Sequence, residues 1–222
     1  MTQENWALPG QKVLEGTVAR VRPIDFDQDQ KGFEASILRP DCRDLWRYTP
    51  IGPFESYVQF ADTMHSAARD TGAIAMVIED KEDGRVLGMA SYLRNRTAHG
   101  STEVGSIVFA PKLKQTKLAT EAMYLMAAHV FDDLGYRRYE WKCNSLNAAS
   151  IRAAERYGFT FEGTFRQDMM VKGENRDTAW FSMLDGEWPL IKAGFQTWLS
   201  SDNFDENGRQ IKSLKDCRTM QA

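Results

Sequence analysis

The chain has 222 residues, a formal net charge of −3 at pH 7 and 27% charged residues. That length is sufficient for one well-buried domain with an additional element. The modest net charge excludes a basic surface over the whole protein, so we expect no nucleic-acid partner. No segment reaches the ~20 consecutive apolar residues of a membrane helix, and residues 1–12 lack an apolar run, so we expect a cytoplasmic protein without membrane contact.

The cysteines and histidines carry no site signature. Cys42, Cys143 and Cys217 are an odd number at wide spacing without a C-x-x-C pair, which predicts free thiols in a reducing compartment. The three histidines form no metal-ligand pattern, so no metal is expected.

The N-terminal half is expected to contain two helices and three strands. An Asp-Gly step at 83–84 is a strong hairpin signal between the last two of these strands. In chain order the expected elements are a strand at 16–22, a helix at 27–38, a helix at 54–69, and strands at 73–79 and 86–93.

The C-terminal half begins with an apolar run at 101–110 that has no helical period and ends at Pro111, which predicts a largely buried strand. Apolar residues then recur at helical spacing from Leu118 to Leu134, and Gly135 supplies the stop. The remaining expected elements are a strand at 139–143, a helix from Asn147, paired strands at 159–171 and 177–184, a helix ending at Leu199, and a polar, partly disordered tail at 200–222.

These elements predict an α/β (α+β) fold, in which helices flank a mixed, mainly antiparallel sheet of about seven strands. One helical crossover lies between Pro111 and Arg137. The domain organisation that we predict is an N-terminal extension at 1–15, a single domain at 16–188, and a C-terminal helix and tail at 189–222.

A pocket for a phosphorylated ligand is expected where the strand at 101–110 leads into the next helix. The amides of residues 116–120 are unpaired donors at the positive end of that helix, and Lys112, Lys114 and Lys117 add charge beside them. The alternative is equally consistent with the residues, because many helices start with solvated lysines and bind nothing.

Several ordered motifs resemble the GNAT acetyltransferase superfamily over roughly residues 18–188, and most closely its ribosomal-protein N-terminal acetyltransferase branch. The matching segments are Glu103-Val104-Gly105, the run from Lys114 to Ala122, Asn147-Ala148-Ala149-Ser150, and the run from Gly158 to Gly163. The resemblance implies a GNAT-like fold and acetyl-CoA as co-substrate. The cofactor-binding residues that it implies are Val108, Phe109, Ala110, Lys114, Gln115, Thr116, Lys117, Leu118, Ala119, Thr120, Asn147 and Ser150.

The chain departs from the family at the diphosphate loop, where Gln115 and Lys117 stand in place of glycines. Glycine allows a ligand to approach the backbone closely, so these side chains must turn outward. Lys117 either contacts a phosphate, obstructs the site or points to solvent. The lost glycines also leave open a non-catalytic CoA-binding module.

The implied chemistry is acyl transfer from a thioester to a primary amine. Glu103 is the candidate base, with the alternative that it only pairs with a basic neighbour. The backbone N–H groups of residues 108–110 are candidate donors to the oxyanion. Ser150 matches a branch serine that serves the departing thiolate, or is simply a residue at a helix N-terminus; Ala154 replaces the tyrosine that other members use.

The acceptor is expected to be a small-molecule or peptide amine, and a homodimer is possible. Asp168 lies next to Met169, the residue that aligns with an acidic position of some branch members. Trp46, Tyr48 and Phe54 are candidates for lining the amine pocket, or else pack the loop. A larger acyl-CoA such as succinyl-CoA is an alternative donor, which a basic side chain at the acyl end would favour.

Overall fold

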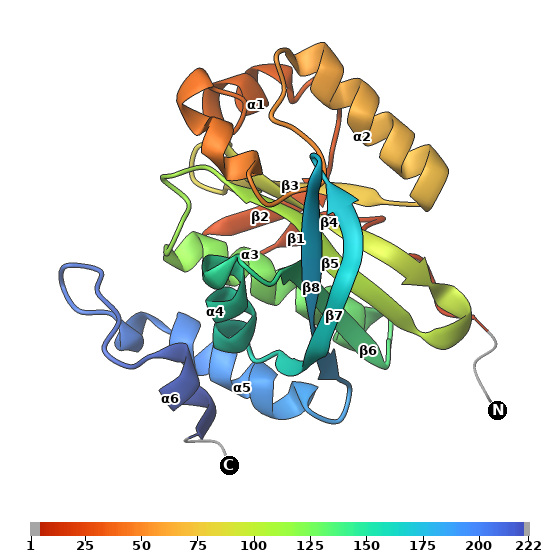
Figure 1. Ribbon diagram of the computed structural model, residues 1–222. Coiled ribbons are helices and arrows are strands. Elements are labelled where there is room, and N and C mark those ends of the chain that lie inside the picture. The colour runs from red at the N-terminus through yellow and green to blue at the C-terminus, as the bar shows by residue number, and fades with distance from the viewer. Residues whose placement is uncertain (1–4, 220–222) are drawn as a thin grey trace.

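The computed structural model describes residues 5–219, in which one eight-stranded mixed sheet separates two groups of helices (Figure 1). The strand order is β1-β2-β3-β4-β5-β6-β8-β7, and every neighbouring pair is antiparallel except β5 and β6. The strands are β1 (Leu14–Glu15), β2 (Ala19–Pro23), β3 (Ile74–Asp80), β4 (Val86–Arg96), β5 (Ser101–Phe109), β6 (Arg138–Asn144), β7 (Thr160–Val171) and β8 (Glu174–Leu184).

The longer helices begin and end where the sequence signals predict. The Ser56 hydroxyl accepts a hydrogen bond from the Gln59 amide at the start of α2, and Gly72 ends that helix with a left-handed φ of 67°. The helices are α1 (Gln30–Ser36), α2 (Tyr57–Thr71), α3 (Lys117–Ala128), α4 (Ala148–Tyr157), α5 (Trp188–Leu199) and α6 (Leu214–Thr219). The shorter helical turns are η1 (Pro40–Trp46), η2 (Thr97–His99), η3 (His129–Asp133) and η4 (Ser201–Asn203).

Each face of the sheet has its own apolar core. On one face, β3, β4 and the end of β5 pack against α1, η1 and α2 through side chains that include Phe33, Trp46 and Phe60. On the other face, residues such as Tyr92, Tyr139 and Phe181 pack against α3, α4 and α5. Helices α1 and α2 cover only part of their face of the sheet (Figure 1). The part formed by β5, β6 and β8 carries charged side chains instead of an apolar core, and we call it the charged floor.

The predicted fold class is confirmed, and two details differ. The sheet has eight strands because the two-residue β1 pairs with β2, Leu14 opposite Val21. The expected four-residue connection at 172–175 is a two-residue turn, since Lys172 and Gly173 both adopt positive φ, at 54° and 82°. That combination is typical of tight hairpins, and it lets β8 begin at Glu174.

The prediction of a partly disordered tail was wrong for the described residues after Ser200. Leu214 and Cys217, three positions apart, give α6 a small apolar face that is completely buried. Arg218 donates from Nη1 to the backbone oxygen of Arg156 in α4, and its side chain lies against Gly194 in α5. The sequence did not indicate this helix because only two of its residues are apolar.

Glu121 in α3 fixes the start of β2. Its buried carboxylate accepts hydrogen bonds from the amides of Thr17, Val18 and Ala19, at 2.8, 2.6 and 2.7 Å. A Cβ at Gly16 would lie 2.5 Å from this carboxylate, so glycine is required there for the close approach. The helix that opens the candidate ligand site is thereby bound to the edge of the sheet.

Replacement of Glu121 by Gln is expected to destabilise the protein by at least about 2 kcal/mol, because charge-assisted bonds are lost and the amide nitrogen faces N–H donors. Urea unfolding measures the effect, with Glu155→Gln on the exposed face of α4 as the control. A loss no larger than that of the control would contradict the anchoring role.

Candidate active site

The centre of the site is a gap between β5 and β6. The two strands pair in parallel from Ser101 and Arg138 to Val104 and Trp141, where their ladder ends. Beyond that point β5 stays paired with β4 as far as Phe109, and β6 stays paired with β8 as far as Asn144. The strands therefore diverge while each is held by its outer neighbour.

A backbone irregularity in β5 decides which amides face this gap. Ser106 has a left-handed φ of 47°, and the register between β4 and β5 shifts at the same place. After the shift the Ala110 amide donates to the Leu87 carbonyl at 2.9 Å, so it is not available to a ligand, contrary to the prediction. Amides alternate in direction along a strand, so Val108 also faces β4 whereas Phe109 faces the gap.

The first turn of α3 presents free backbone donors beside the gap. Thr116 is the N-cap, and its hydroxyl accepts from the Ala119 amide at 3.1 Å. The Thr120 amide donates to the Thr116 carbonyl, and the Thr116 amide to the Leu113 carbonyl. Three of the five predicted donors, the amides of Thr116, Ala119 and Thr120, are thus already bonded. Within residues 115–120, the amides of Gln115, Lys117 and Leu118 have no acceptor among the described residues.

The two residues that replace glycines behave differently. Gln115 adopts the left-handed conformation, with φ of 62°, so the backbone keeps a shape that glycine adopts most easily. Lys117 is the first residue of α3 and has no positive φ, and its ammonium lies 4.7 Å from the centre of the Phe204 ring. The half-buried Lys117 side chain is therefore turned toward the C-terminal segment, and its contact with a phosphate stays a prediction.

Glu103 lies on β5 one residue before the parallel ladder ends. Its side chain is buried, 2.9 Å from the Lys142 ammonium and 3.9 Å from the Arg94 guanidinium. Burial raises the pKa of Glu103 above its usual value, and the Lys142 ammonium opposes that rise. The carboxylate is ion-paired, as the alternative interpretation expected, and it lies where the strands separate; its role as a base stays a prediction.

Ser150 lies on the β6 side of the gap. Asn147 caps α4, with its side-chain oxygen accepting from the Ser150 amide at 3.1 Å, and the Ser150 hydroxyl accepts from the Trp141 indole at 3.0 Å. Burial raises the pKa of the nearby Cys143 thiol, and a hydrogen bond with Ser150 opposes that shift. An accepting hydroxyl still has its own proton to donate, so Ser150 can serve a sulfur atom in the gap.

The aromatic residues predicted for the acceptor pocket belong mostly to the core. Trp46 is buried, donates from its indole to the Ile37 carbonyl at 3.2 Å, and meets Phe54 edge to face at 4.9 Å. Tyr48 is half-buried, beside the Arg47 guanidinium. Trp46 and Phe54 therefore pack the loop, because a cluster of large rings gains more from mutual burial than from exposure in a pocket.

The tip of the β7–β8 hairpin reaches the same loop. Lys172 donates to the Trp46 carbonyl at 2.6 Å, and Figure 1 shows the hairpin rising toward the α1 and α2 side of the sheet.

The charged floor contains a cavity of about 490 Å³, next to Glu103 and Lys142. Asp168 borders it, as do Arg94, Arg96, Arg138, Glu140, Glu162, Gly163, Phe165 and Trp180. Sequence reasoning missed these residues apart from Asp168. A signal was present in β6, where charged residues at 138, 140 and 142 alternate with buried Tyr139, Trp141 and Cys143, so one face of the strand had to be polar.

Comparison with known protein families identifies the family of this chain. The acetyltransferase (GNAT) domain family matches residues 20–160. The chain belongs to the GNAT acetyltransferase family.

Among solved structures, this acetyltransferase-family chain is similar to a GCN5-related N-acetyltransferase from Brucella melitensis, with 39% identity, a TM-score of 0.92 and coverage of 98% of this chain and 99% of that one. A protein from Chromobacterium violaceum described as a probable GNAT acetyltransferase has 38% identity and a TM-score of 0.78, over 85% of this chain and 93% of that one.

A curated relative in Bacillus subtilis (strain 168), provisionally named ribosomal N-acetyltransferase YdaF, is 27% identical over 106 residues. The match covers 48% of this chain and 57% of the relative, so the chain spans little more than half of that relative's length.

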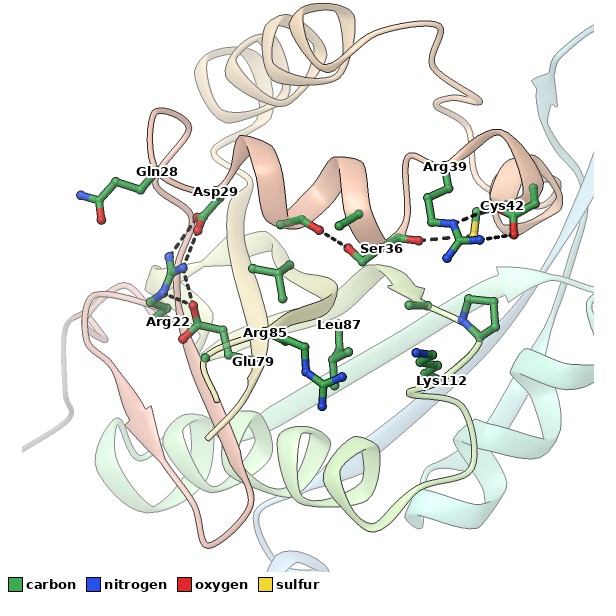
Figure 2. A pocket seen from close by; sticks show the side chains of 17 residues that line it. Arg22, Gln28, Asp29, Ser36, Arg39, Cys42, Glu79, Arg85, Leu87 and Lys112 are labelled. Carbon is green, nitrogen blue, oxygen red and sulfur yellow. Dashed lines mark hydrogen bonds and ion pairs between the residues drawn. The ribbon is translucent and has the colours of Figure 1, made fainter. Parts of the chain in front are cut away.

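A second cavity of this GNAT chain, of about 540 Å³, lies beside α1 and the β3–β4 connection. Figure 2 shows Arg22 between Asp29 and Glu79, with Nη1 2.9 Å from an Asp29 oxygen and Nε 2.9 Å from a Glu79 oxygen. The two carboxylates raise the pKa of Arg22, with the Asp29 hydrogen bond as the largest cause. We interpret this triad as a structural connection between α1 and the sheet.

Within residues 5–219, no helix is long and apolar enough to cross a membrane, and no group of three or more His, Cys, Asp or Glu side chains has a metal-binding arrangement.

Glycine substitutions at the two loop positions of this GNAT member should have opposite effects. Gln115→Gly is expected to leave the free energy of unfolding unchanged or to raise it by up to about 1 kcal/mol, because the left-handed backbone strain is relieved. Lys117→Gly should lower it by about 1 kcal/mol, because glycine is unfavourable in a helix and the Phe204 contact is lost. Urea unfolding of both variants checks this, and equal losses would contradict it.

Proposed function

We propose that the protein is an acetyl-CoA-dependent N-acetyltransferase, which moves an acetyl group directly to a primary amine of a small molecule or of a protein N-terminus. The observation that carries the proposal is the gap between β5 and β6, with Glu103 on one side, Ser150 on the other and the free amides of α3 at its end. Family membership and the likeness to the relatives support it.

The chain's donors suit the diphosphate of CoA. Three amides without an acceptor point from the positive end of α3, and Lys114 in the preceding turn is exposed. Gln115 adopts a left-handed conformation that glycine adopts most easily, which supports a ligand-binding loop over a non-catalytic module. When bound, acetyl-CoA supplies a thioester-activated acetyl group.

Groups around the gap can accept the proton of the amine, stabilise the oxyanion and donate a hydrogen bond to the thiolate. An unperturbed lysine-like amine has a pKa of about 10.4 and is mostly protonated at neutral pH, so a base must accept its proton. Glu103, one residue before the end of the ladder and 2.9 Å from the Lys142 ammonium, takes that role. The Phe109 amide is directed to stabilise the oxyanion, and the Ser150 hydroxyl to donate a hydrogen bond to the departing thiolate.

A larger acyl-CoA such as succinyl-CoA is the second candidate donor. The observation in its favour is that the basic side chains of Lys142 and Arg94 lie beside Glu103, near the opening of the gap. Lys142 is already neutralised by Glu103, which favours acetyl-CoA as the donor. Isothermal titration with acetyl-CoA and succinyl-CoA, followed by thiol-release assays over a panel of amines, tests both.

Glu103→Gln is expected to lower turnover by about 10²- to 10⁴-fold while acetyl-CoA affinity stays nearly unchanged, because a proton acceptor is lost and no loop donor is touched. The pKa of Glu103 is raised, and a base must be deprotonated, so wild-type kcat/KM should fall as the pH drops through that raised pKa. The variant should lose this acid limb and recover rate at high pH, where free amine is abundant. A variant with the wild-type pH profile and turnover would exclude Glu103 as the base.

Ser150→Ala should lower kcat across the whole pH range, since the thiolate loses a hydrogen-bond donor that does not titrate. Acetyl-CoA affinity, measured by titration, should change little because Asn147 still caps α4. Unaltered kcat with a folded variant would show that Ser150 only accepts the Trp141 hydrogen bond.

A further inference from the structure

Among the described residues that line the cavity next to Glu103, Arg94 is the arginine whose guanidinium forms no hydrogen bond within the chain. The other two arginines of the cavity, Arg96 and Arg138, lie 2.8 and 2.7 Å from Glu140, at hydrogen-bond distance. Lys142, beside the cavity, lies 2.9 Å from Glu103. Arg94 is 3.8 Å from Glu140 and 3.9 Å from Glu103, and no hydrogen bond joins it to any described residue. Its guanidinium therefore has its planar set of N–H donors available.

The backbone and an aromatic ring hold Arg94 in place. Arg94 has a left-handed φ of 47°, at a register shift between β4 and β5, which is unfavourable for a residue with a side chain. Its guanidinium lies 4.9 Å from the centre of the Trp180 ring, which orients it without using its donors. The arrangement presents a fixed guanidinium to the cavity.

Two further polar atoms of the cavity lack partners among the described residues. Glu140 is only 2% exposed, yet its Oε2 atom forms no hydrogen bond, and the buried indole nitrogen of Trp180 has no acceptor. Buried polar groups are normally paired, because leaving one unpaired costs free energy. A ligand with both an acceptor and a donor would satisfy this side of the cavity, and the Arg94 guanidinium matches a carboxylate in geometry and charge.

We propose that this cavity binds a carboxylate group of the substrate through Arg94, so that the enzyme selects carboxylate-bearing substrates. The inference rests on the proposed acetyltransferase function, because it places the carboxylate beside the gap where transfer occurs. Trp180 is the second donor to that carboxylate, and Glu140 accepts from an N–H group of the same ligand.

The carboxylate can belong to either substrate of the reaction. It is carried by the acceptor if the amine is an amino acid or a peptide with a free carboxyl end, and by the donor if the acyl group is a dicarboxylic one. Arg94 borders both the cavity and the opening of the gap, through its proximity to Glu103. The site chemistry is the same in both cases.

Three thiol-release reactions distinguish these sources. The first pairs acetyl-CoA with α-amino acids and dipeptides, the second pairs acetyl-CoA with their C-terminal amides, and the third pairs succinyl-CoA with the same amides. We expect either the first or the third reaction to exceed the second in kcat/KM.

Arg94→Gln should raise KM for the carboxylate-bearing substrate by about 10- to 100-fold, as expected for lost charge-assisted bonds, with little change in kcat.

The conservative Arg94→Lys variant should recover part of the affinity, because it keeps the charge and loses the planar pair of donors. Arg69→Gln, at the exposed end of α2, is the matched control and should leave every reaction unchanged. The inference is overturned if the second reaction is as fast as the other two, or if Arg94→Gln affects all three equally or not at all.

Titration separates failure of the inference from failure of the proposed function. Wild-type protein that binds neither acetyl-CoA nor succinyl-CoA would overturn both. If a CoA ester binds but no amine of the panel reacts, titration of the CoA-saturated protein with succinate decides: binding that Arg94→Gln weakens supports the inference, and binding that is absent or independent of Arg94 overturns it.

Discussion

The structure depends on the separation of two parallel strands in the middle of a sheet that is otherwise continuous. Unpaired backbone groups inside a sheet are unfavourable, and the gap persists because β4 and β8 hold β5 and β6 on their outer sides. The helix that follows β5 begins at the same end, so its free amides and the strand amide of Phe109 face one space. In sheets with parallel strands, ligands bind outside the carboxyl ends of those strands, which is where this gap opens.

Charge placement follows from the same geometry. On the face of β6 opposite α3, charged side chains form ion pairs instead of an apolar layer: Arg138 pairs with Glu140, and Lys142 pairs with Glu103 in β5. Buried charges are costly unless they are paired, and these pairs set the properties of the proposed base. For Glu103, burial favours the neutral acid whereas Lys142 favours the carboxylate, and the balance leaves a pKa above the usual value.

The C-terminal segment packs against α3, whose first turn we propose as the binding site for the diphosphate of CoA. Phe204 lies over Lys117 at the start of α3, and the Arg156 guanidinium lies between the Thr120 hydroxyl and the Trp198 ring. The segment after β8 therefore supports the helix whose amides we assign to the diphosphate. The Phe204 ring gives the Lys117 side chain a packing partner within the chain.

The sequence by itself determined the fold class, most elements and the family, because hydrophobic periodicity, turn residues and ordered motifs are local properties of the chain. It also predicted the position of the β5–α3 junction. Glu103 and Ser150 became candidates because neighbouring residues in the sequence indicate a strand end and a helix cap. Only the tertiary structure decided that Ala110 is bonded to Leu87, that Trp46 and Phe54 are core residues, and that Lys117 contacts Phe204. Arg94 and Trp180 meet only because β4 and β8 lie in one sheet, and contacts between strands so distant in sequence leave no local pattern to read.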